Sequence, residues 1–125
     1  TINTLNKFDV WIECTKIQIY YRSSKKNMTK FIDTSLFSMA YRVYGEGENT
    51  LVCIHGYGLD ASIWEDWIDK MHFNGKIICI DLPFHGHTVS KSNDNLHISI
   101  QDAMNCMLAL LEKENVPKAI WCGYS

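Results

Sequence analysis

The sequence of 125 residues contains no apolar segment approaching the length of about 20 residues that is needed to cross a bilayer. It also lacks a basic surplus, because 12 Lys and Arg stand against 14 Asp and Glu and the formal net charge is −2. Binding to nucleic acid through a run of phosphates is therefore not expected. The first ten residues do not show a charged start followed by an apolar stretch, so no secretion signal is visible. We therefore expect a soluble, cytoplasmic protein that does not bind membranes.

The five cysteines are an odd number, and no two have the spacing of a metal knuckle or a redox pair. Neither a disulfide framework nor a metal site is expected. Cys53, Cys79 and Cys122 lie inside apolar runs, where a reduced thiol acts as a small buried hydrophobic group.

From residue 51 onward, β-prone apolar runs alternate with helix-like segments. This pattern predicts an α/β fold, in which a mostly parallel sheet is connected by right-handed crossover helices. The runs 51–54, 77–80 and 119–122 are continuously apolar, as suits strands covered on both faces, so we expect them to be central strands.

Two amphipathic helices are expected between these strands. Ser62 and Glu65 have the spacing of a capping box, and apolar residues recur three and four apart as far as Met71. Ser99 and Asp102 begin a second helix, which must end before Pro117. The apolar side of the second helix is expected to consist of Ala103, Met104, Met107, Leu108, Leu110 and Leu111.

The chain divides near Met28. Residues 37–44 alternate loosely and predict an antiparallel strand toward one edge of the sheet. Residues 1–27 are interpreted as an N-terminal extension of uncertain structure, although residues 8–21 are rich enough in β-prone residues to form one further strand. The expected domain therefore covers residues 28–125.

Chemistry-bearing residues follow each of the three predicted central strands, at the edge where open α/β sheets bind ligands. The three segments are His55-Gly56-Tyr57-Gly58, Asp81-Leu82-Pro83-Phe84-His85-Gly86-His87-Thr88 and Gly123-Tyr124-Ser125. Glycines in the first segment permit a sharp turn that leaves the Tyr57 N–H free to act as a donor. In the third, a glycine two positions before a serine at a strand end is the opening of a nucleophile elbow, whose bend exposes the serine oxygen.

In their order and spacing, these three motifs resemble the α/β-hydrolase family over roughly residues 28–125, the N-terminal half of that fold. The first looks like the family's HGxx oxyanion loop, the second like its DLPGHGxS loop, and the third like the start of its elbow. Phe84 and Thr88 depart from the pattern, which usually has glycine and serine at these positions.

The resemblance implies a hydrolase that acts on an ester, a thioester or a related small acyl compound and needs no cofactor. Ser125 would be the nucleophile and the Tyr57 backbone N–H the oxyanion donor. Binding positions would be His55, Gly56, Gly58 and Tyr124. A serine at the elbow argues against the family's branches that use a carboxylate nucleophile.

In this family the acid and the histidine follow the serine in the chain, so they would lie beyond residue 125. We therefore expect the domain to be truncated at the elbow and the chain alone to be inactive. We also expect it to associate through an unpaired apolar edge of the sheet.

The other polar residues at this edge favour structural interpretations. His55 is expected to anchor its turn through ring hydrogen bonds, and His85 and His87 to do likewise or face solvent. Asp81 is expected to fix the loop that follows it by binding backbone amides. Two alternative functions remain open, which are a menaquinone-pathway lyase of the same fold and an inactive fragment or pseudo-enzyme with a binding role.

Overall fold

The computed structural model describes residues 2–4, 11–13, 28–92 and 97–125, the first two segments as backbone alone. Those two segments form an antiparallel pair, β1 (Ile2–Thr4) with β2 (Trp11–Glu13). β2 falls within residues 8–21, for which the sequence indicated a further strand. The rest of that prediction, and most of the proposed extension, lies outside the described residues.

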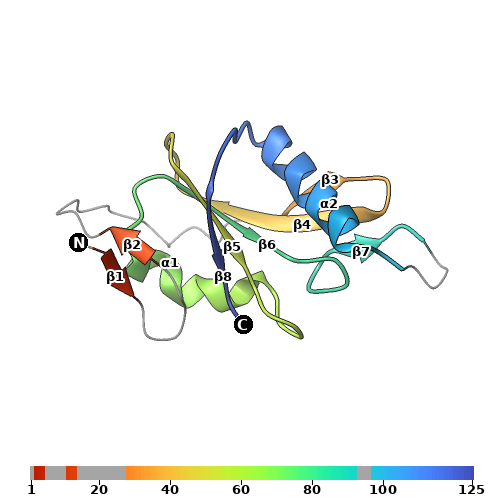
Figure 1. Cartoon of the computed structure of the whole chain (residues 1–125), viewed down its shortest axis with the longest axis horizontal. Helices are drawn as coiled ribbons and strands as arrows, with labels where there is room; N and C mark the ends of the chain where they lie inside the picture. The colour runs from red at the N-terminus through yellow and green to blue at the C-terminus, as the bar shows by residue number, and fades with distance from the viewer. Residues whose placement is uncertain (1, 5–10, 14–27, 93–96) are drawn as a thin grey trace.

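The main sheet has the strand order β3-β4-β6-β5-β8, and a short strand, β7, pairs with β4 (Figure 1). Its strands are β3 (Lys30–Asp33), β4 (Phe37–Tyr44), β5 (Thr50–Ile54), β6 (Lys76–Ile80), β7 (Val89–Ser90) and β8 (Ile120–Gly123). β5 pairs in parallel with both β6 and β8, while the pairs made by β4 are antiparallel. The three apolar runs therefore form the parallel part of a mixed sheet, as the sequence predicted.

β5 and β6 are buried on both faces, because alternate residues enter two different cores. Cys53 and Cys79 pack with α1 (Glu65–Met71) on one face, and Val52 and Ile78 pack with α2 (Ile100–Lys113) on the other. The two helices thus cover opposite faces of the sheet. The chain passes from β5 through α1 to β6, and then from β6 through α2 to β8 on the other side of β5. Two crossovers that run in opposite directions but have the same hand place their helices on opposite faces.

β8 differs from the prediction of a central strand covered on both faces. It is the last strand of the sheet among the described residues, and Ile120 and Trp121 are 55% and 46% exposed. Only Cys122 of this strand is buried. An apolar run alone does not reveal how many neighbours a strand has.

The first predicted helix is present, but it begins differently. Residues Ala61–Trp64 form a 3-10 turn that leads into α1. Asp60 caps this turn by accepting a hydrogen bond from the Ser62 N–H, at 2.8 Å. The predicted cap at Ser62 is therefore wrong, because a carboxylate two residues earlier already satisfies that amide.

The second helix begins as predicted. Ser99 accepts from the Asp102 N–H, and the Asp102 carboxylate accepts from the Ser99 N–H, which completes the capping box of α2. The predicted apolar side is only partly buried, because Leu110 and Leu111 enter the core while Met104 and Leu108 are 42% and 49% exposed.

β4 is antiparallel and lies toward one edge of the sheet, as predicted, between the edge strand β3 and β6. Its partner β3 escaped prediction because three of its four residues are exposed and no apolar run marks it. Neither helix among the described residues has the length and apolar character that spanning a bilayer would require.

Candidate active site

The three predicted motifs lie together at the end of the sheet where the parallel strands have their carboxyl ends. The loops after β5 and β6 leave the carboxyl ends of neighbouring strands, and residues Tyr124 and Ser125 leave the end of β8 on the other side of β5. The β5 loop leads to α1 and the β6 loop leads toward α2 on the opposite face, so adjacent connections diverge. In open α/β sheets this divergence marks the ligand-binding end.

Ser125 lies directly against Gly56. A Cβ placed on Gly56 would come within 2.9 Å of the Ser125 Cβ and 2.9 Å of the Tyr124 carbonyl oxygen, closer than real side chains approach. Only glycine permits this contact. Ser125 itself is exposed and has a φ of 85°, a left-handed conformation that is costly for a residue with a Cβ.

The segment Gly56–Leu59 forms a tight turn beside this serine. The Leu59 N–H donates to the Gly56 carbonyl at 3.2 Å, and Gly58 has a φ of 75°, as the third residue of a type II turn requires. The Tyr57 side chain is 95% exposed. Within the described residues the Tyr57 N–H has no hydrogen-bond partner, so it remains available as a donor one residue from the Ser125 contact.

His55 fastens this turn to the loop after β6. Its ring is buried, its Nδ1 lies 2.8 Å from the Gly56 carbonyl oxygen, and its Nε2 accepts from the Leu82 N–H at 3.0 Å. A carbonyl can only accept, so Nδ1 carries the ring proton and Nε2 is the acceptor. The predicted anchoring role of His55 is confirmed.

His85 has the same pattern one loop further along. Its Nδ1 lies 2.9 Å from the Pro83 carbonyl oxygen, and its Nε2 accepts from the Gly58 N–H at 3.1 Å. Its ring lies 5.0 Å from the His55 ring between centroids. Both imidazoles therefore use both nitrogens to hold loops together, and neither has a nitrogen free to accept a proton from Ser125.

Asp81 organises the loop after β6, as predicted. Its buried carboxylate accepts from the Ala61 N–H at 2.7 Å and from the His87 N–H at 2.8 Å. A Cβ on Gly86 would lie 2.3 Å from the Asp81 Oδ2, so this loop needs glycine there. His87 lies 3.5 Å from the same carboxylate through Nδ1, but most of its side chain faces solvent.

The two departures from the family pattern have different consequences. Thr88 supplies a hydroxyl as a serine would, and its Oγ1 donates to the Asp81 carbonyl and accepts from the Ala40 N–H. Phe84 occupies a position with a φ of 66°, where glycine would be unstrained. Its ring is 57% exposed and packs edge-on against the buried Phe37, with centroids 5.2 Å apart.

Three thiols lie beneath this edge without forming a reactive site. Cys53 pairs in register with Cys79 on one side and Cys122 on the other, and all three are buried. The hydrogen bond to Cys53, together with burial, raises the pKa of the Cys122 thiol well above its usual value. The pKa of the Cys53 thiol is also raised, so Cys53 and Cys122 are poor nucleophiles. Among the described residues no group of three His, Cys, Asp or Glu side chains has the arrangement of a metal site.

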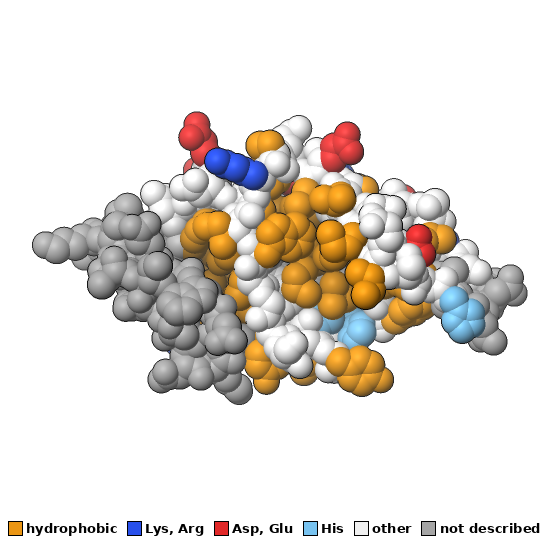
Figure 2. All heavy atoms as spheres, viewed as in Figure 1, with side chains coloured by type: hydrophobic (Ala, Val, Ile, Leu, Met, Phe, Trp, Pro, Cys, Tyr) orange, Lys and Arg blue, Asp and Glu red, His pale blue; other side chains and the backbone are white. Residues whose placement is uncertain are grey.

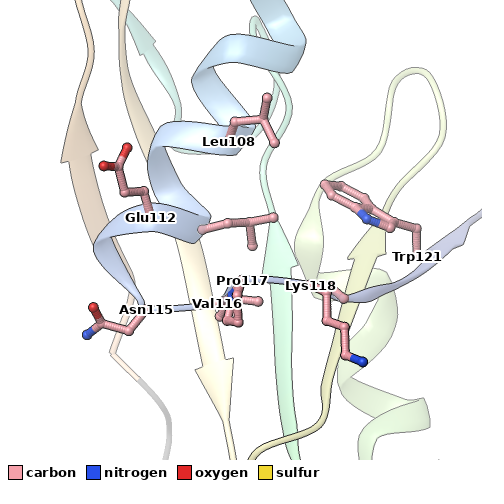
Figure 3. Close-up of a pocket in the computed structure, with 9 residues that line it drawn as sticks. Leu108, Glu112, Asn115, Val116, Pro117, Lys118 and Trp121 are labelled. Carbon is pink, nitrogen blue, oxygen red and sulfur yellow. The ribbon is translucent and has the colours of Figure 1, made fainter.

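A separate apolar groove of about 570 Å³ lies toward the beginning of β8, away from Ser125. Leu108 from α2 and Trp121 from β8 lie on two sides of it, and Val116 and Pro117 lie below them in the view (Figure 3). Hydrophobic side chains gather on the same face of the molecule, over β8 and α2 (Figure 2). Its lining includes the charged Glu112 and Lys118 but no serine, cysteine or histidine, so we do not take it as the candidate active site.

The sequence placed Ser125, Tyr57, His55, Gly56 and Gly58 at one edge, and the structure brings them together there. Tyr124 is half-buried against the core beside α1, and its N–H donates to the Ile54 carbonyl. The link from His85 to Gly58 was not predicted in this form, because no spacing rule connects a histidine in one loop to an amide in another.

The relatives found by sequence comparison carry the name of an esterase. Over 88 residues the chain is 30% identical to the pimeloyl-acyl-carrier protein methyl ester esterase of Vibrio atlanticus, and the match covers 70% of the chain and 31% of the relative. The protein of the same name from Yersinia pseudotuberculosis is 31% identical over 81 residues, covering 65% and 28%. The chain thus spans about a third of the length of these relatives. A scan against models of protein families finds no match.

Two solved structures with the same fold are described as a hydrolase and a putative epoxide hydrolase. A hydrolase from Pseudomonas aeruginosa superimposes with a TM-score of 0.68 at 22% identity, covering 81% of this chain and 38% of that one. A putative epoxide hydrolase from the same organism also gives a TM-score of 0.68, at 14% identity, covering 77% and 32%. The chain therefore has the N-terminal part of the α/β-hydrolase fold.

Proposed function

We propose that Ser125 is the nucleophile of a hydrolase that acts on an ester, a thioester or a related acyl compound. The observation that carries the proposal is the contact between Ser125 and Gly56, which sets a strained, exposed serine beside the free Tyr57 amide. The esterase name of the relatives supports the same class of substrate.

In the proposed reaction, the Ser125 oxygen attacks the acyl carbonyl and its proton passes to a general base. The carbonyl oxygen becomes an oxyanion, and the Tyr57 N–H donates a hydrogen bond to it. When the tetrahedral intermediate collapses, the alcohol or thiol leaves with a proton from the same base. Water then releases the acid by the reverse sequence.

The proposal assigns the base to polypeptide beyond residue 125, together with the acid that orients it. His55 and His85 are unsuitable as the base because each already uses both ring nitrogens. On this proposal residues 28–125 are the N-terminal half of the catalytic domain, carrying the nucleophile and one oxyanion donor.

The test joins the chain at residue 125 to the part of the Vibrio atlanticus esterase that follows the aligned segment. A fluorophosphonate is added to this chimera, to its Ser125→Ala variant and to the 125-residue chain alone, and the modified peptide is mapped by mass spectrometry. We expect labelling of Ser125 in the chimera only, because a hydroxyl without a base is a weak nucleophile.

Two results would contradict this proposal, the first for the nucleophile and the second for the position of the base. Labelling of the chimera at another residue would remove Ser125 from its role. Equal labelling of the chain alone would show that the base lies within these 125 residues. The lyase alternative predicts that the chimera is labelled at Ser125 but that, before labelling, it has no activity on simple esters.

We further propose that the exposed apolar face of β8 is covered by a second copy when the chain is present by itself. Trp121 and Leu108, which both line the groove on the α2 side of β8, are each about half exposed. An unpaired strand with apolar neighbours is a common site of association.

A further inference from the structure

We propose that His85 is a positioning residue, whose neutral imidazole holds the Gly58 N–H and thereby keeps the Tyr57 amide directed at the Ser125 side of the turn. The catalytic meaning of this role rests on the function proposed above. The hydrogen bond, and its effect on the Gly58 amide, can be tested without relying on that function.

The ring has only one proton arrangement that satisfies both of its contacts. The Pro83 carbonyl oxygen can only accept, so the proton lies on Nδ1, 2.9 Å away. Nε2 is then a bare acceptor, and the Gly58 N–H donates to it at 3.1 Å. His85 therefore bridges the tips of two loops that are far apart in the sequence.

The turn Gly56–Leu59 makes few other contacts at its tip. A Cβ on Gly58 would meet no atom within 4 Å, and the Tyr57 side chain is 95% exposed. The turn's own closing bond, from the Leu59 N–H to the Gly56 carbonyl, is 3.2 Å long. The Tyr57 ring lies edge-on to the same imidazole, with centroids 5.9 Å apart. Backbone and side chain of this turn thus both contact His85.

His85 is itself held rigidly enough to act as a support. Its N–H donates to the Leu82 carbonyl at 3.0 Å, closing a turn in which Phe84 takes the left-handed position. The Phe84 ring packs against the buried Phe37. This contact explains what an aromatic residue adds where glycine would be less strained, because it fastens the turn carrying His85 to the core.

This role differs from the anchoring by His55. His55 is buried and ties its own strand end to Leu82, whereas His85 reaches the tip of the turn, next to the proposed oxyanion donor. Loss of the His85 bond should therefore loosen the Tyr57 amide while β5 and β6 remain paired.

The first measurement uses the unaltered 125-residue chain labelled with ¹⁵N. A scalar coupling across the hydrogen bond between the Gly58 nitrogen and His85 Nε2, together with a protonated Nδ1, is expected. A ring protonated at Nε2 and lacking this coupling would overturn the proposal, and this readout does not depend on any variant folding.

The second measurement compares hydrogen exchange at the Gly58 amide in three variants. His85→Leu removes the acceptor, and exchange should accelerate about tenfold, as expected for loss of one hydrogen bond. His85→Gln offers an amide oxygen and should restore most of the protection. His87→Leu, in the same loop but largely exposed, is the matched control and should leave Gly58 unchanged.

In the chimera, His85→Leu should lower kcat with little change in KM, and His85→Gln should recover part of it, because an oxyanion donor acts in the transition state. Unchanged Gly58 exchange in His85→Leu would overturn the proposal. Altered exchange combined with no fluorophosphonate labelling at Ser125 would uphold the positioning contact and reject the catalytic function.

Discussion

At the scale of single residues, backbone strain is concentrated at the candidate site. Four residues other than glycine have positive φ among those described. His72 and Asn115 adopt this conformation just after α1 and α2, where helix ends commonly do so. Phe84 and Ser125 have no such explanation, and such conformations cost on the order of 1–3 kcal/mol each. The Phe84 conformation belongs to the turn that carries His85, and the Ser125 conformation lies at the proposed nucleophile.

A proline at position 57 isolates the proposed oxyanion donor. Tyr57 occupies the second position of its turn, which proline suits, so Tyr57→Pro removes the N–H while keeping the backbone shape. In the chimera we expect kcat for a p-nitrophenyl ester to fall by about 10²–10³, the usual effect of losing one oxyanion donor. Tyr57→Ala keeps the amide and should change kcat little. Equal activity of the two variants would remove the Tyr57 amide from the mechanism.

At the scale of helices and strands, the sequence predicted the elements that have a recognisable apolar or capping pattern. The runs at β5 and β6 were predictable because both faces are buried, and the start of α2 because Ser99 and Asp102 form a complete capping box. β3 and β7 are short and largely exposed, so no apolar pattern marks them. The exposure of β8 depends on its neighbours, which its own residues do not specify.

The candidate site, too, could be predicted from the sequence only in part. Glycine and serine at successive strand ends sufficed to predict that Tyr57 and Ser125 share an edge, because parallel strands end together. The link from His85 to Gly58 depends on a ring tautomer and on two turn geometries. Neither can be obtained from residue spacing.

The end of α2 is tied to the antiparallel strands through Glu114. Its carboxylate accepts from the Lys30 ammonium at 2.6 Å and from the Tyr41 hydroxyl at 2.7 Å. Burial by itself raises the carboxyl pKa, but the hydrogen bonds from Lys30 and Tyr41 outweigh it and leave the pKa below its usual value. A lowered carboxyl pKa in the folded state stabilises the fold above the unfolded-state pKa, and this stabilisation is lost as the pH falls through the folded-state pKa.

We therefore expect Glu114→Gln to lower the free energy of unfolding by about 1 kcal/mol at pH 7, as for a hydrogen-bonded ion pair near the surface. The difference between the two proteins should shrink once the pH falls below the ordinary range of glutamate. The free energy of unfolding of both proteins is measured by urea unfolding at pH 7 and at a pH below the ordinary range of glutamate. A difference that is independent of pH would assign the effect to packing and not to charge.

At the scale of the whole molecule, the strands of the sheet are unequally covered. α1 and α2 cover β5 and β6, while β8 leaves apolar side chains exposed beside the groove under the end of α2 (Figure 3). A molecule of this size has little surplus stability with which to tolerate such exposure. The proposed association would remove this surface from water.

Sedimentation of the 125-residue chain at micromolar concentration tests this proposal. We expect oligomers whose dissociation constant rises at least about tenfold in Trp121→Glu, because a half-exposed aromatic residue is replaced by a charge that resists desolvation. Lys118→Gln, at the rim of the same groove, should have little effect. A monomer with a sharp, cooperative melting transition would contradict the proposal.

The contact between Gly56 and Ser125 also constrains how this protein can change over evolutionary time. A lineage that gained even a methyl group at position 56 would displace the serine, and a compensating change would have to move the end of β8. We therefore expect substitutions at position 56 to be rare unless the end of β8 changes as well.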